Sequence, residues 1–299
     1  EAQYFTPDTG KNVLELKHKR IAICIGNDVP DSKNISLAIN ICAHEYRCGA
    51  ESQELSYQGC GFPVISLSQC GANTEAIYEG HSFVSSVVGK RILQLPYFDE
   101  SLVVYETDKA YPSIAEEQPH HIALLHDALV LGIRDYFRKN KFTNAVLGLS
   151  GGIDSAVVLS LAVEALGSDN VRVLLLPSEF SSSHSITDAE ALARNLSIEH
   201  SIISIKGVYD ASLDALAPLF KSLPFSTAEE NLQARIRGVL LMAVSNKFGD
   251  IVLNTSNKSE VAVGYGTLYG DTTGSLSVLG DVYKTDVFKL ARYINRESE

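Results

Sequence analysis

The sequence predicts an α/β protein whose C-terminal part forms a doubly wound parallel sheet. From residue 122 onward, apolar runs typical of buried strands alternate with segments of helical spacing, which is the pattern of consecutive βαβ units. A Ser/Gly turn joins the first of these strands to its helix at residues 150–152. Before residue 110, short β-rich runs separated by turn residues indicate a part of different architecture.

The length of 299 residues is enough for two domains, since a typical domain has roughly 100–200 residues. We expect an N-terminal domain over residues 1–110, a linker over residues 111–121 and a C-terminal domain over residues 122–299. Pro112 and the polar stretch at 115–121 mark the linker.

The individual elements follow from local patterns. In the N-terminal domain, runs rich in β-branched and aromatic residues predict strands at Arg20–Ile25, Phe62–Ser68, Ala76–Val88 and Leu102–Tyr105. In the C-terminal domain, apolar runs predict strands at Ala145–Leu149, Val171–Leu176, Ser201–Ile205 and Ile251–Asn254. Apolar residues at helical spacing predict helices at 122–138, 155–166, 185–195, 209–221, 227–247 and 286–295. Gly167 ends the second helix, and Thr227 to Glu230 begin the long fifth one as a capping box.

The segment Leu147–Ser155, with the sequence LGLSGGIDS, has the features of an anion site. Backbone N–H groups can approach a phosphate closely at three glycines, Gly148, Gly151 and Gly152, and the following helix N-terminus favours negative charge. Ser150 and Ser155 can donate hydroxyl groups to phosphate oxygens, and Asp154 can bind Mg²⁺. The turn contains no Lys, so it differs from the GxxxxGK[ST] loop of ordinary NTPases. The alternative is a turn whose glycines serve backbone geometry only.

The second strand and the long helix offer further ligand contacts. Leu176–Ser178 follows the second strand, where an adenosine could lie in a doubly wound fold. Asn231 and Arg235 are four residues apart on the long helix, so they share a face from which both could reach a phosphate or ribose. Arg237 is expected to point elsewhere, as a solvated or ion-paired side chain. The alternative for Asn231 and Arg235 is an exposed polar helix face.

Two polar segments follow the last predicted strand. Asn254–Glu260 lies at the carboxyl edge of the sheet, where Glu260 is a candidate second carboxylate for Mg²⁺ beside Asp154. The alternative for Glu260 is a helix-capping acid. Gly264–Gly274 is long and glycine-rich, and we expect this loop to be mobile or wrapped round a ligand.

The C-terminal domain resembles the NAD⁺ synthetase family of ATP-dependent amide-forming ligases. The segments that carry the resemblance are, in order, LGLSGGIDSA, ENLQARIRG, NTSNKSEVAVGY, LYGD and GDVYKT. SGGIDS alone also fits GMP synthetases, asparagine synthetases and tRNA-modifying ligases. The combination of ENLQARIRG with NKSE and LYGD favours the NAD⁺ synthetases.

The resemblance implies a role for each matching residue. The residues implied to bind ATP are Gly148, Ser150, Gly151, Gly152, Asp154, Ser155, Thr255 and Lys284. Asp154 and Glu260 are implied to bind Mg²⁺, and Asp154 and Lys284 to act in catalysis. The residues implied to contact deamido-NAD⁺ are Asn231, Arg235, Glu260, Tyr265 and Asp271, the last in a segment that closes over this ligand.

The family chemistry has two steps. The nicotinate carboxylate of deamido-NAD⁺ attacks the α-phosphate of ATP, which gives an acyl-adenylate and pyrophosphate. Ammonia then attacks the activated carbonyl, which gives NAD⁺ and AMP. The protein's task is to position two polyanions and to neutralise their charge.

The N-terminal domain resembles the nitrilase-like glutaminase domain of glutamine-dependent NAD⁺ synthetases, part of an α/β sandwich. The matching segments are Tyr4–Pro7, Arg20–Ile23, Glu79–Phe83 and Phe98–Glu100. That family hydrolyses glutamine with a Cys nucleophile, a Glu base and a Lys. Here Gly26 takes the expected position of the nucleophile, Cys24 lies two residues earlier, and the segment with the Glu and Lys is absent from the sequence. We therefore expect an incomplete or degenerate glutaminase domain and a chain that uses free ammonia. Family members also continue beyond the position of Glu299, so we expect a truncated C-terminus.

The amino-acid composition argues against some of the remaining functional classes. A formal net charge of −11 argues against a nucleic-acid surface, which disfavours a tRNA-modifying ligase. No run of apolar residues suggests a membrane span or a signal peptide, and the five cysteines form no CxxC pair. We expect a cytoplasmic enzyme that acts on small molecules and binds neither nucleic acid nor membrane. Two further classes stay open, a carbon–nitrogen hydrolase and a catalytically dead scaffold.

The family resemblance also implies a homodimer or larger assembly. The apolar helix at 239–244 could contribute to its interface, unless this helix belongs to the core of the domain.

Overall fold

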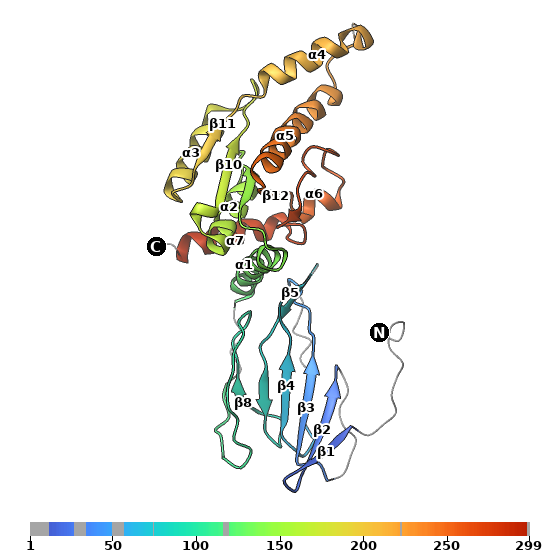
Figure 1. Cartoon of the computed structure of the whole chain (residues 1–299), viewed down its shortest axis with the longest axis vertical. Coiled ribbons are helices and arrows are strands. Elements are labelled where there is room, and N and C mark those ends of the chain that lie inside the picture. The colour runs from blue at the N-terminus through green and yellow to red at the C-terminus, as the bar shows by residue number, and fades with distance from the viewer. Residues whose placement is uncertain are drawn as a thin grey trace. The chain divides into compact units, whose positions relative to one another are not determined.

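The computed structural model describes residues 12–26, 34–49, 57–73, 75–115, 120–221 and 223–297. The chain forms two compact units, Glu1–Pro119 and His120–Glu299, and Figure 1 labels most of their elements. The boundary between the units falls within the stretch 111–121. The motif Tyr4–Pro7 and residues 27–33 lie outside the described residues.

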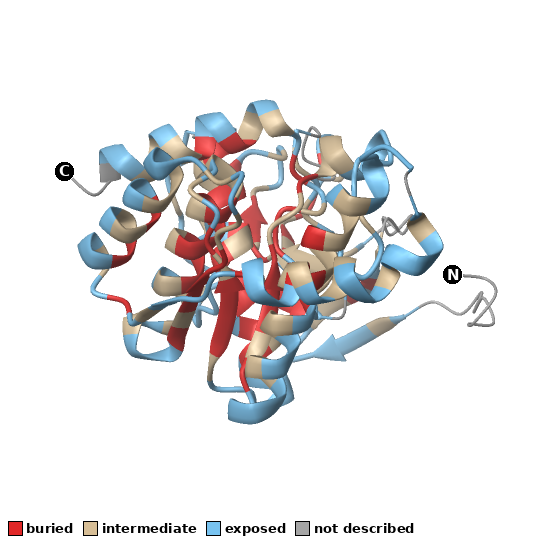
Figure 2. Ribbon diagram, turned by 90° about the horizontal axis from the view of Figure 1, so that it is seen from above, coloured by how far each residue is buried: buried red, intermediate tan, exposed pale blue. Residues whose placement is uncertain are grey.

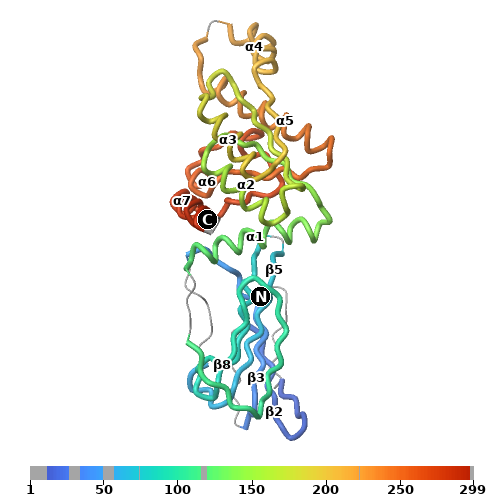
Figure 3. The backbone as a smooth tube through the Cα atoms, turned by 90° about the vertical axis from the view of Figure 1, so that its left-hand side faces the viewer, coloured from blue at the N-terminus to red at the C-terminus, as the bar shows by residue number. Residues whose placement is uncertain are grey.

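The first unit contains a mixed sheet. Its strands are β1 (Val13–Leu16), β2 (Lys19–Ile25), β3 (Leu37–Cys42), β4 (Val64–Ser68), β5 (Cys70–Asn73), β6 (Ala76–Glu79), β7 (Phe83–Ser85) and β8 (Arg91–Gln94). Six of them form one sheet in the order β1-β2-β3-β4-β7-β8, and β5 pairs with β6 as a separate hairpin. Strands β2, β3 and β4 are parallel, whereas β1, β7 and β8 are antiparallel to their neighbours. Figure 3 shows β2, β3 and β8 as extended traces.

Side chains on the central strands of this sheet alternate between a buried and an exposed face. On β2, Ala22 and Cys24 are buried, whereas Ile23 and Ile25 are exposed. Such alternation is expected of a sheet whose two faces differ in burial. The core on the buried face consists of Ala22, Ala38, Tyr57, Phe62, Val64 and Phe83.

Two strand predictions in this unit are wrong in part or in whole. The run predicted as one strand over Ala76–Val88 forms two strands, β6 and β7, because Gly80 between them has a φ of 69° and turns the chain. The strand predicted at Leu102–Tyr105 does not form. Leu102 is 96% exposed and Val104 81% exposed, so this segment lacks the half-buried neighbours through which β-branched residues stabilise a strand.

The second unit contains the predicted parallel sheet. Its strands are β9 (Ala145–Gly148), β10 (Val171–Leu175), β11 (His200–Ile202), β12 (Ile251–Asn254) and β13 (Leu276–Ser277). Their order is β11-β10-β9-β12-β13, and every pairing is parallel. The prediction of an α/β fold with a doubly wound C-terminal sheet is confirmed.

Helices cover this sheet. They are α1 (His121–Asn140), α2 (Ile153–Leu166), α3 (Ser183–Asn195), α4 (Lys206–Phe220), α5 (Thr227–Phe248), α6 (Lys258–Ala262) and α7 (Lys284–Glu297). Figure 2 shows the central strands in red as buried, while the outer turns of the helices are pale blue and exposed. Within the described ranges, no helix is both long enough and apolar enough to cross a membrane.

The chain order fixes which face each helix covers. From β9 the chain moves outward through α2, β10 and α3 to β11, and it then returns through α5 to β12 on the other side of β9. Right-handed crossovers in opposite directions place their helices on opposite faces. Accordingly, α1, α2 and α7 pack together, with α2 against β9 and β10, whereas α5 packs against β9, β12 and α4. The strand order reverses at β9, which is where doubly wound proteins bind ligands.

The ends of the helices follow the local sequence closely. Gly167 ends α2 with a φ of 85°, as predicted. The long helix α5 has its capping box one residue earlier than predicted: the N-cap is Ser226, whose hydroxyl accepts from the Ala228 N–H, while the Glu229 carboxylate accepts from the Ser226 N–H. A capping box needs the acid at the third helical position, and Glu229 meets this requirement only with Ser226 as the cap.

A buried histidine joins three helices of the second unit. His126 on α1 contacts the Asp127 carboxylate through Nδ1 at 3.0 Å and the Glu164 carboxylate on α2 through Nε2 at 2.9 Å. Its ring also packs on Tyr293 of α7, with 5.2 Å between the ring centroids. Burial lowers the pKa of His126, but the hydrogen bond to Asp127 and the charges of Glu164 and Asp127 outweigh this effect and raise the pKa above its ordinary value of 6.5. The imidazolium therefore stabilises this helix junction.

This contact predicts a specific pH dependence of stability. A histidine whose pKa is raised by folding contributes its full stabilisation below the unfolded-state value near 6.5, and it loses that contribution as the pH rises through the folded-state value. We expect the free energy of unfolding in urea to fall as the pH rises above about 6.5, and His126→Gln to remove this fall. The control His121→Gln, at an exposed position on the same helix, should keep it. An unchanged pH profile in His126→Gln would rule out the contact as its source.

A close contact joins the Ser/Gly turn to the start of α3. Gly151 has a φ of 79°, and a Cβ at this position would overlap the backbone of Ser185, with its carbonyl carbon at 2.9 Å. A side chain is therefore excluded both by backbone conformation and by space.

The substitution Gly151→Ala should therefore destabilise the second unit. We expect a loss on the order of 1–3 kcal/mol from backbone strain together with the displaced α3. Gly167→Ala is the matched control, because Gly167 has a similar φ of 85° but its Cβ would meet its nearest neighbour only at 4.0 Å. Urea unfolding of both variants measures the difference, and equal losses would show that the contact with Ser185 has no effect of its own.

Candidate active site

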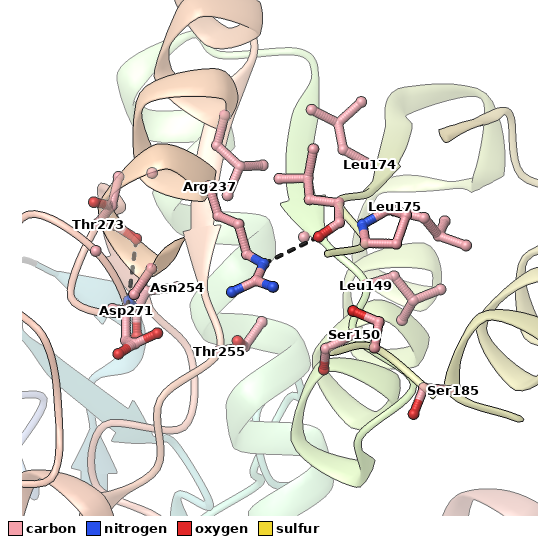
Figure 4. Close-up of a pocket in the computed structure, with 18 of the residues that line it drawn as sticks. Leu149, Ser150, Leu174, Leu175, Ser185, Arg237, Asn254, Thr255, Asp271 and Thr273 are labelled. Atoms are coloured by element: carbon pink, nitrogen blue, oxygen red, sulfur yellow. Dashed lines mark hydrogen bonds between the residues drawn. The ribbon is translucent and has the colours of Figure 1, made fainter. Parts of the chain in front are cut away.

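A pocket of about 410 Å³ lies at the carboxyl edge of the parallel sheet in the second unit. The ends of β9, β10 and β12 form its base, and α5 forms one wall (Figure 4). Its apolar lining includes Leu149, Leu174, Leu175, Leu176, Pro177, Ile186 and Leu241. Its polar lining includes Ser150, Arg237, Asn254, Thr255, Asp271 and Thr273. A cavity lined by apolar side chains together with convergent polar groups is typical of a small-molecule site.

The Ser/Gly turn borders this pocket and leads into α2. Ser155 is buried, and its hydroxyl donates to the Gly152 carbonyl oxygen at 3.0 Å. The hydroxyl groups of Ser150 and Ser155 lie 3.1 Å apart, and the Gly152 N–H donates to Ser150 Oγ at 3.3 Å. Gly152 is the N-cap of α2 and provides no side-chain cap. The first N–H groups of α2 are therefore available to an anion.

Asp154 joins three segments beside the turn. Its Oδ1 accepts a hydrogen bond from Asn257 Nδ2 at 3.1 Å, and its Oδ2 forms an ion pair with Lys284 Nζ. Asn257 is buried and precedes α6, whereas Lys284 is the first residue of α7. A carboxylate, an ammonium group and a helix N-terminus thus meet at one point.

Glu260 reaches the same point from α6. Its Oε2 accepts from the backbone N–H of Asn257 at 3.0 Å, so it completes a capping box with Asn257 as the N-cap. The helix-capping role of Glu260 is therefore present. Asp154 and Glu260 both contact Asn257, one through its side chain and the other through its backbone.

The donors at this point fit Mg²⁺ bound together with phosphate. Within the described residues, no three His, Cys, Asp or Glu side chains gather as metal ligands. Mg²⁺ is commonly bound by one or two carboxylates while substrate phosphates and water fill its other positions. Asp154 and Glu260 match that donor chemistry.

The glycine-rich loop 264–274 folds onto α5 in this structure. Thr267 Oγ1 donates to Asn231 Oδ1 at 2.8 Å, and Arg235 Nε donates to the Leu268 carbonyl oxygen at 3.1 Å. A Cβ on Gly270 would lie 2.9 Å from the Ala234 backbone. The loop therefore needs glycine here because it approaches the helix so closely.

The site residues predicted from the sequence fall into three groups. Gly148, Ser150, Thr255 and Asp271 line the pocket. Gly151, Gly152, Asp154, Ser155, Glu260 and Lys284 belong to the turn and to the neighbouring cluster around Asn257. Asn231 and Arg235 lie beneath the loop, while Tyr265 is 78% exposed and lines no wall of the pocket.

Arg237 points away from the face of Asn231 and Arg235 as expected, but the expectation of a solvated or ion-paired side chain is wrong. Its side chain lines the pocket and crosses from α5 to the end of β10, where its Nε donates to the Leu176 carbonyl oxygen at 3.0 Å (Figure 4). Burial lowers the pKa of the guanidinium, and the charge of Asp271 partly opposes this effect. Helical spacing places Arg237 off the face of Asn231 and Arg235, but it does not reveal that α5 has a second face toward a cavity.

Two asparagines, Asn254 and Asn257, belong to the site although neither was singled out from the sequence. Asn254 Nδ2 donates to the carbonyl oxygens of Asp271 at 2.6 Å and Thr273 at 3.1 Å, which fixes the end of the loop at the pocket. Asn257 links Asp154 to Glu260. The spacing of Asn257 and Glu260 is that of a capping box, so a signal for Asn257 was present in the sequence.

The first unit has no thiol at the expected position of a glutaminase nucleophile. Gly26 follows β2 with a φ of 68°, and its carbonyl oxygen accepts from Asn40 Nδ2 at 3.0 Å. Cys24 is buried on β2, and the Sγ of Cys42, also buried, lies 3.6 Å from the Gly26 carbonyl oxygen. Burial raises the pKa of the Cys42 thiol more than its hydrogen bond with Ser66 lowers it. A catalytic thiolate requires the opposite shift.

Comparison with known proteins agrees with this geometry. The NAD synthase family matches residues 125–298. The chain is 45% identical over 275 residues to the glutamine-dependent NAD(+) synthetase of Synechocystis sp., covering 89% of this chain and 49% of that protein. The chain thus spans about half the length of this curated relative.

Solved structures show the same similarity. The glutamine-dependent NAD⁺ synthetase of Acinetobacter baumannii, in complex with ADP, superposes with a TM-score of 0.93 at 36% identity, covering 100% of this chain and 60% of that one. The NH3-dependent NAD synthetase of Campylobacter jejuni superposes with a TM-score of 0.54 at 35% identity, covering 58% of this chain and 73% of that one. The family match covers more than half of the chain and includes the turn, the long helix and the residues around Asn257. The chain therefore belongs to the NAD synthase family.

Proposed function

We propose that the second unit catalyses the ATP-dependent amidation of deamido-NAD⁺ to NAD⁺. The observation that carries this proposal is the meeting of three features at one sheet edge: a pocket of nucleoside size, an uncapped helix N-terminus, and the Asp154–Lys284 pair. The pocket complements a nucleoside, the helix N-terminus complements a phosphate group, and the Asp154–Lys284 pair complements the phosphate charge. The names of the relatives support the same reaction.

ATP would bind across the pocket and the turn. The apolar residues of the pocket at the end of β10 suit the adenosine, and the N–H groups of the turn and of α2 suit the phosphates. Lys284 would contribute its charge to the same phosphates, and Thr255, which lines the pocket, would offer a hydroxyl group. Asp154 and Glu260 would bind Mg²⁺, which supplies positive charge to the phosphate oxygens.

Deamido-NAD⁺ would bind at the loop side of α5. Asn231 and Arg235 already contact the backbone and side chains of the loop 264–274, and Asp271 lies both in that loop and in the pocket wall. The loop therefore connects the two ligand regions. Tyr265 would approach the dinucleotide only when the loop rearranges or a second subunit contributes. The exposed side chains of Val239 and Met242 on α5 support a homo-oligomer.

The proposed reaction needs no covalent nucleophile on the protein. The chain's residues would hold the nicotinate carboxylate in line with the α-phosphate and neutralise the charge of the departing pyrophosphate. Ammonia would then replace AMP on the activated carbonyl. Orientation and electrostatics are therefore the main contributions of the protein.

The products test this proposal directly. With ATP, Mg²⁺, deamido-NAD⁺ and ammonium chloride, we expect AMP, pyrophosphate and NAD⁺ in equal amounts. Asp154→Ala should lower turnover by about 100-fold or more, because it removes a positioned charge from the phosphate site. The control Asp214→Ala changes an exposed carboxylate on α4 and should leave turnover unchanged. If the unaltered chain forms none of the three products, the proposal fails. Normal turnover in Asp154→Ala would instead refute only the role of this carboxylate.

We further propose that this chain takes its nitrogen from ammonia. Glutamine hydrolysis needs a thiolate with a nearby base, whereas Gly26 occupies the expected position and the thiols of Cys24 and Cys42 nearby are buried. The relative from Synechocystis sp., named as glutamine-dependent, is about twice as long as the region that this chain matches.

The nitrogen source can be measured by comparing ammonium chloride with glutamine in ammonia-free buffer. We expect NAD⁺ formation with ammonium chloride and a rate with glutamine at least about 100-fold lower, because Gly26 offers no oriented nucleophile. Cys24→Ala should leave the ammonia-dependent rate unchanged. Rapid synthesis with glutamine that disappears in Cys24→Ala would identify Cys24 as the nucleophile and overturn the proposal.

A further inference from the structure

Arg237 is a cation in the wall of the pocket, and its geometry is fixed. Its Nε donates to the Leu176 carbonyl oxygen at 3.0 Å, so one edge of the guanidinium is already bonded to the protein. Figure 4 shows the terminal nitrogens turned into the pocket, toward Thr255 and the side on which Ser150 lies. The group thus presents its free edge to whatever occupies the pocket.

This guanidinium has no carboxylate partner among the residues that the structure describes. None of the ion pairs between those residues includes Arg237, and its hydrogen bond to the chain is made to a neutral carbonyl group. Asp271 lines the same pocket and acts on Arg237 only through its charge at longer range. A partly buried charge without a partner is costly, so an anionic ligand would be bound more strongly here than on the open surface.

The position of Arg237 indicates which part of a bound nucleotide it would contact. Figure 4 shows its terminal nitrogens turned toward Thr255, which follows β12, and Ser150, which begins the turn, lines the same pocket. The turn that leads into α2 lines the pocket through Gly148, Leu149 and Ser150. Leu174, Leu175 and Leu176 line it at the end of β10, to which Arg237 is bonded. If the distal phosphates occupy the turn and the adenosine lies against these leucines, the phosphate between the two regions is the one bonded to the ribose.

We propose that Arg237 binds the α-phosphate of ATP and stays on it in the adenylate, as a catalytic residue of the proposed function on which this inference rests. In the first step a carboxylate oxygen of deamido-NAD⁺ forms a bond to the α-phosphorus. The bond from that phosphorus to the bridging oxygen breaks, and its electron pair leaves with pyrophosphate. No proton moves, and the guanidinium remains charged throughout. The planar guanidinium can donate hydrogen bonds to two phosphate oxygens at the same time.

The simplest competing role is structural, in which Arg237 only joins α5 to the end of β10. The bond to Leu176 uses Nε alone, and a joining role gives no reason for the terminal nitrogens to face the cavity. The two roles differ in what they predict for ligands with and without a phosphate.

The test measures the affinities of adenosine, AMP and ATP by calorimetry on the 299-residue chain in the presence of Mg²⁺. Arg237→Gln should weaken AMP and ATP by about 10- to 100-fold each, because one charge-assisted contact is lost, and should leave adenosine within about twofold. Arg237→Lys keeps the charge without the planar guanidinium and should lose less. The matched control is Arg194→Gln on α3, where an exposed arginine pairs with Glu190, and it should change none of the three affinities.

The remaining outcomes separate a failure of this inference from a failure of the proposed function. An equal loss for adenosine, AMP and ATP in both variants would show a structural role. A loss for ATP without a loss for AMP would assign Arg237 to the distal phosphates, and unchanged affinities would remove it from the phosphate site. If the unaltered chain binds the nucleotides but forms no NAD⁺, the proposed function fails while the phosphate contact stands. If the unaltered chain binds none of them, both fail.

Discussion

The contact on which the site depends most is the one between Asp154, Lys284 and Asn257. These residues belong to α2, to the start of α7 and to the turn before α6, segments that are far apart in the sequence. A carboxylate with a cation on one oxygen and an amide on the other keeps its position even when the phosphates are absent. The polar edge of the sheet is thus organised by charge, whereas the rest of the unit is held by its apolar core.

The second constraint is the close approach of the loop 264–274 to α5. Gly238 on the helix and Gly270 on the loop leave no room for a Cβ, and Asn254 fixes the far end of the loop at the strand. Because of these contacts, α5 borders both the loop and the pocket. One face of α5 carries Asn231 and Arg235 toward the loop, and the adjoining face carries Arg237 toward the pocket.

Much of the second unit could be predicted because local and tertiary preferences agree there. Buried parallel strands read as continuous apolar runs, and helices such as α2 end at a glycine that the chain needs for its turn. The first unit was harder, since β1, β5 and β8 have only four residues each and the apolar run of β3 is interrupted by the buried Asn40. The strand predicted at Leu102–Tyr105 does not form, because a high strand propensity does not suffice without a neighbouring strand to pair with.

At the site, the turn and Asp154 could be predicted from residue type and spacing. Arg237 and Asn254 could not, because their roles depend on contacts to segments distant in the sequence.

Because α5 contacts both the loop and the pocket, an insertion or deletion within this helix would disturb the register between the two contacts. Each residue added to a helix rotates everything beyond it by about 100° and moves it by about 1.5 Å. One insertion between Asn231 and Arg237 would therefore turn the loop contacts and the pocket arginine out of register with each other. An insertion before Ser226, in the connection from α4, would leave the register of α5 intact. Indels tolerated by this fold should accumulate in that connection, and the spacing from Asn231 to Gly238 should stay constant wherever both ligand surfaces are used.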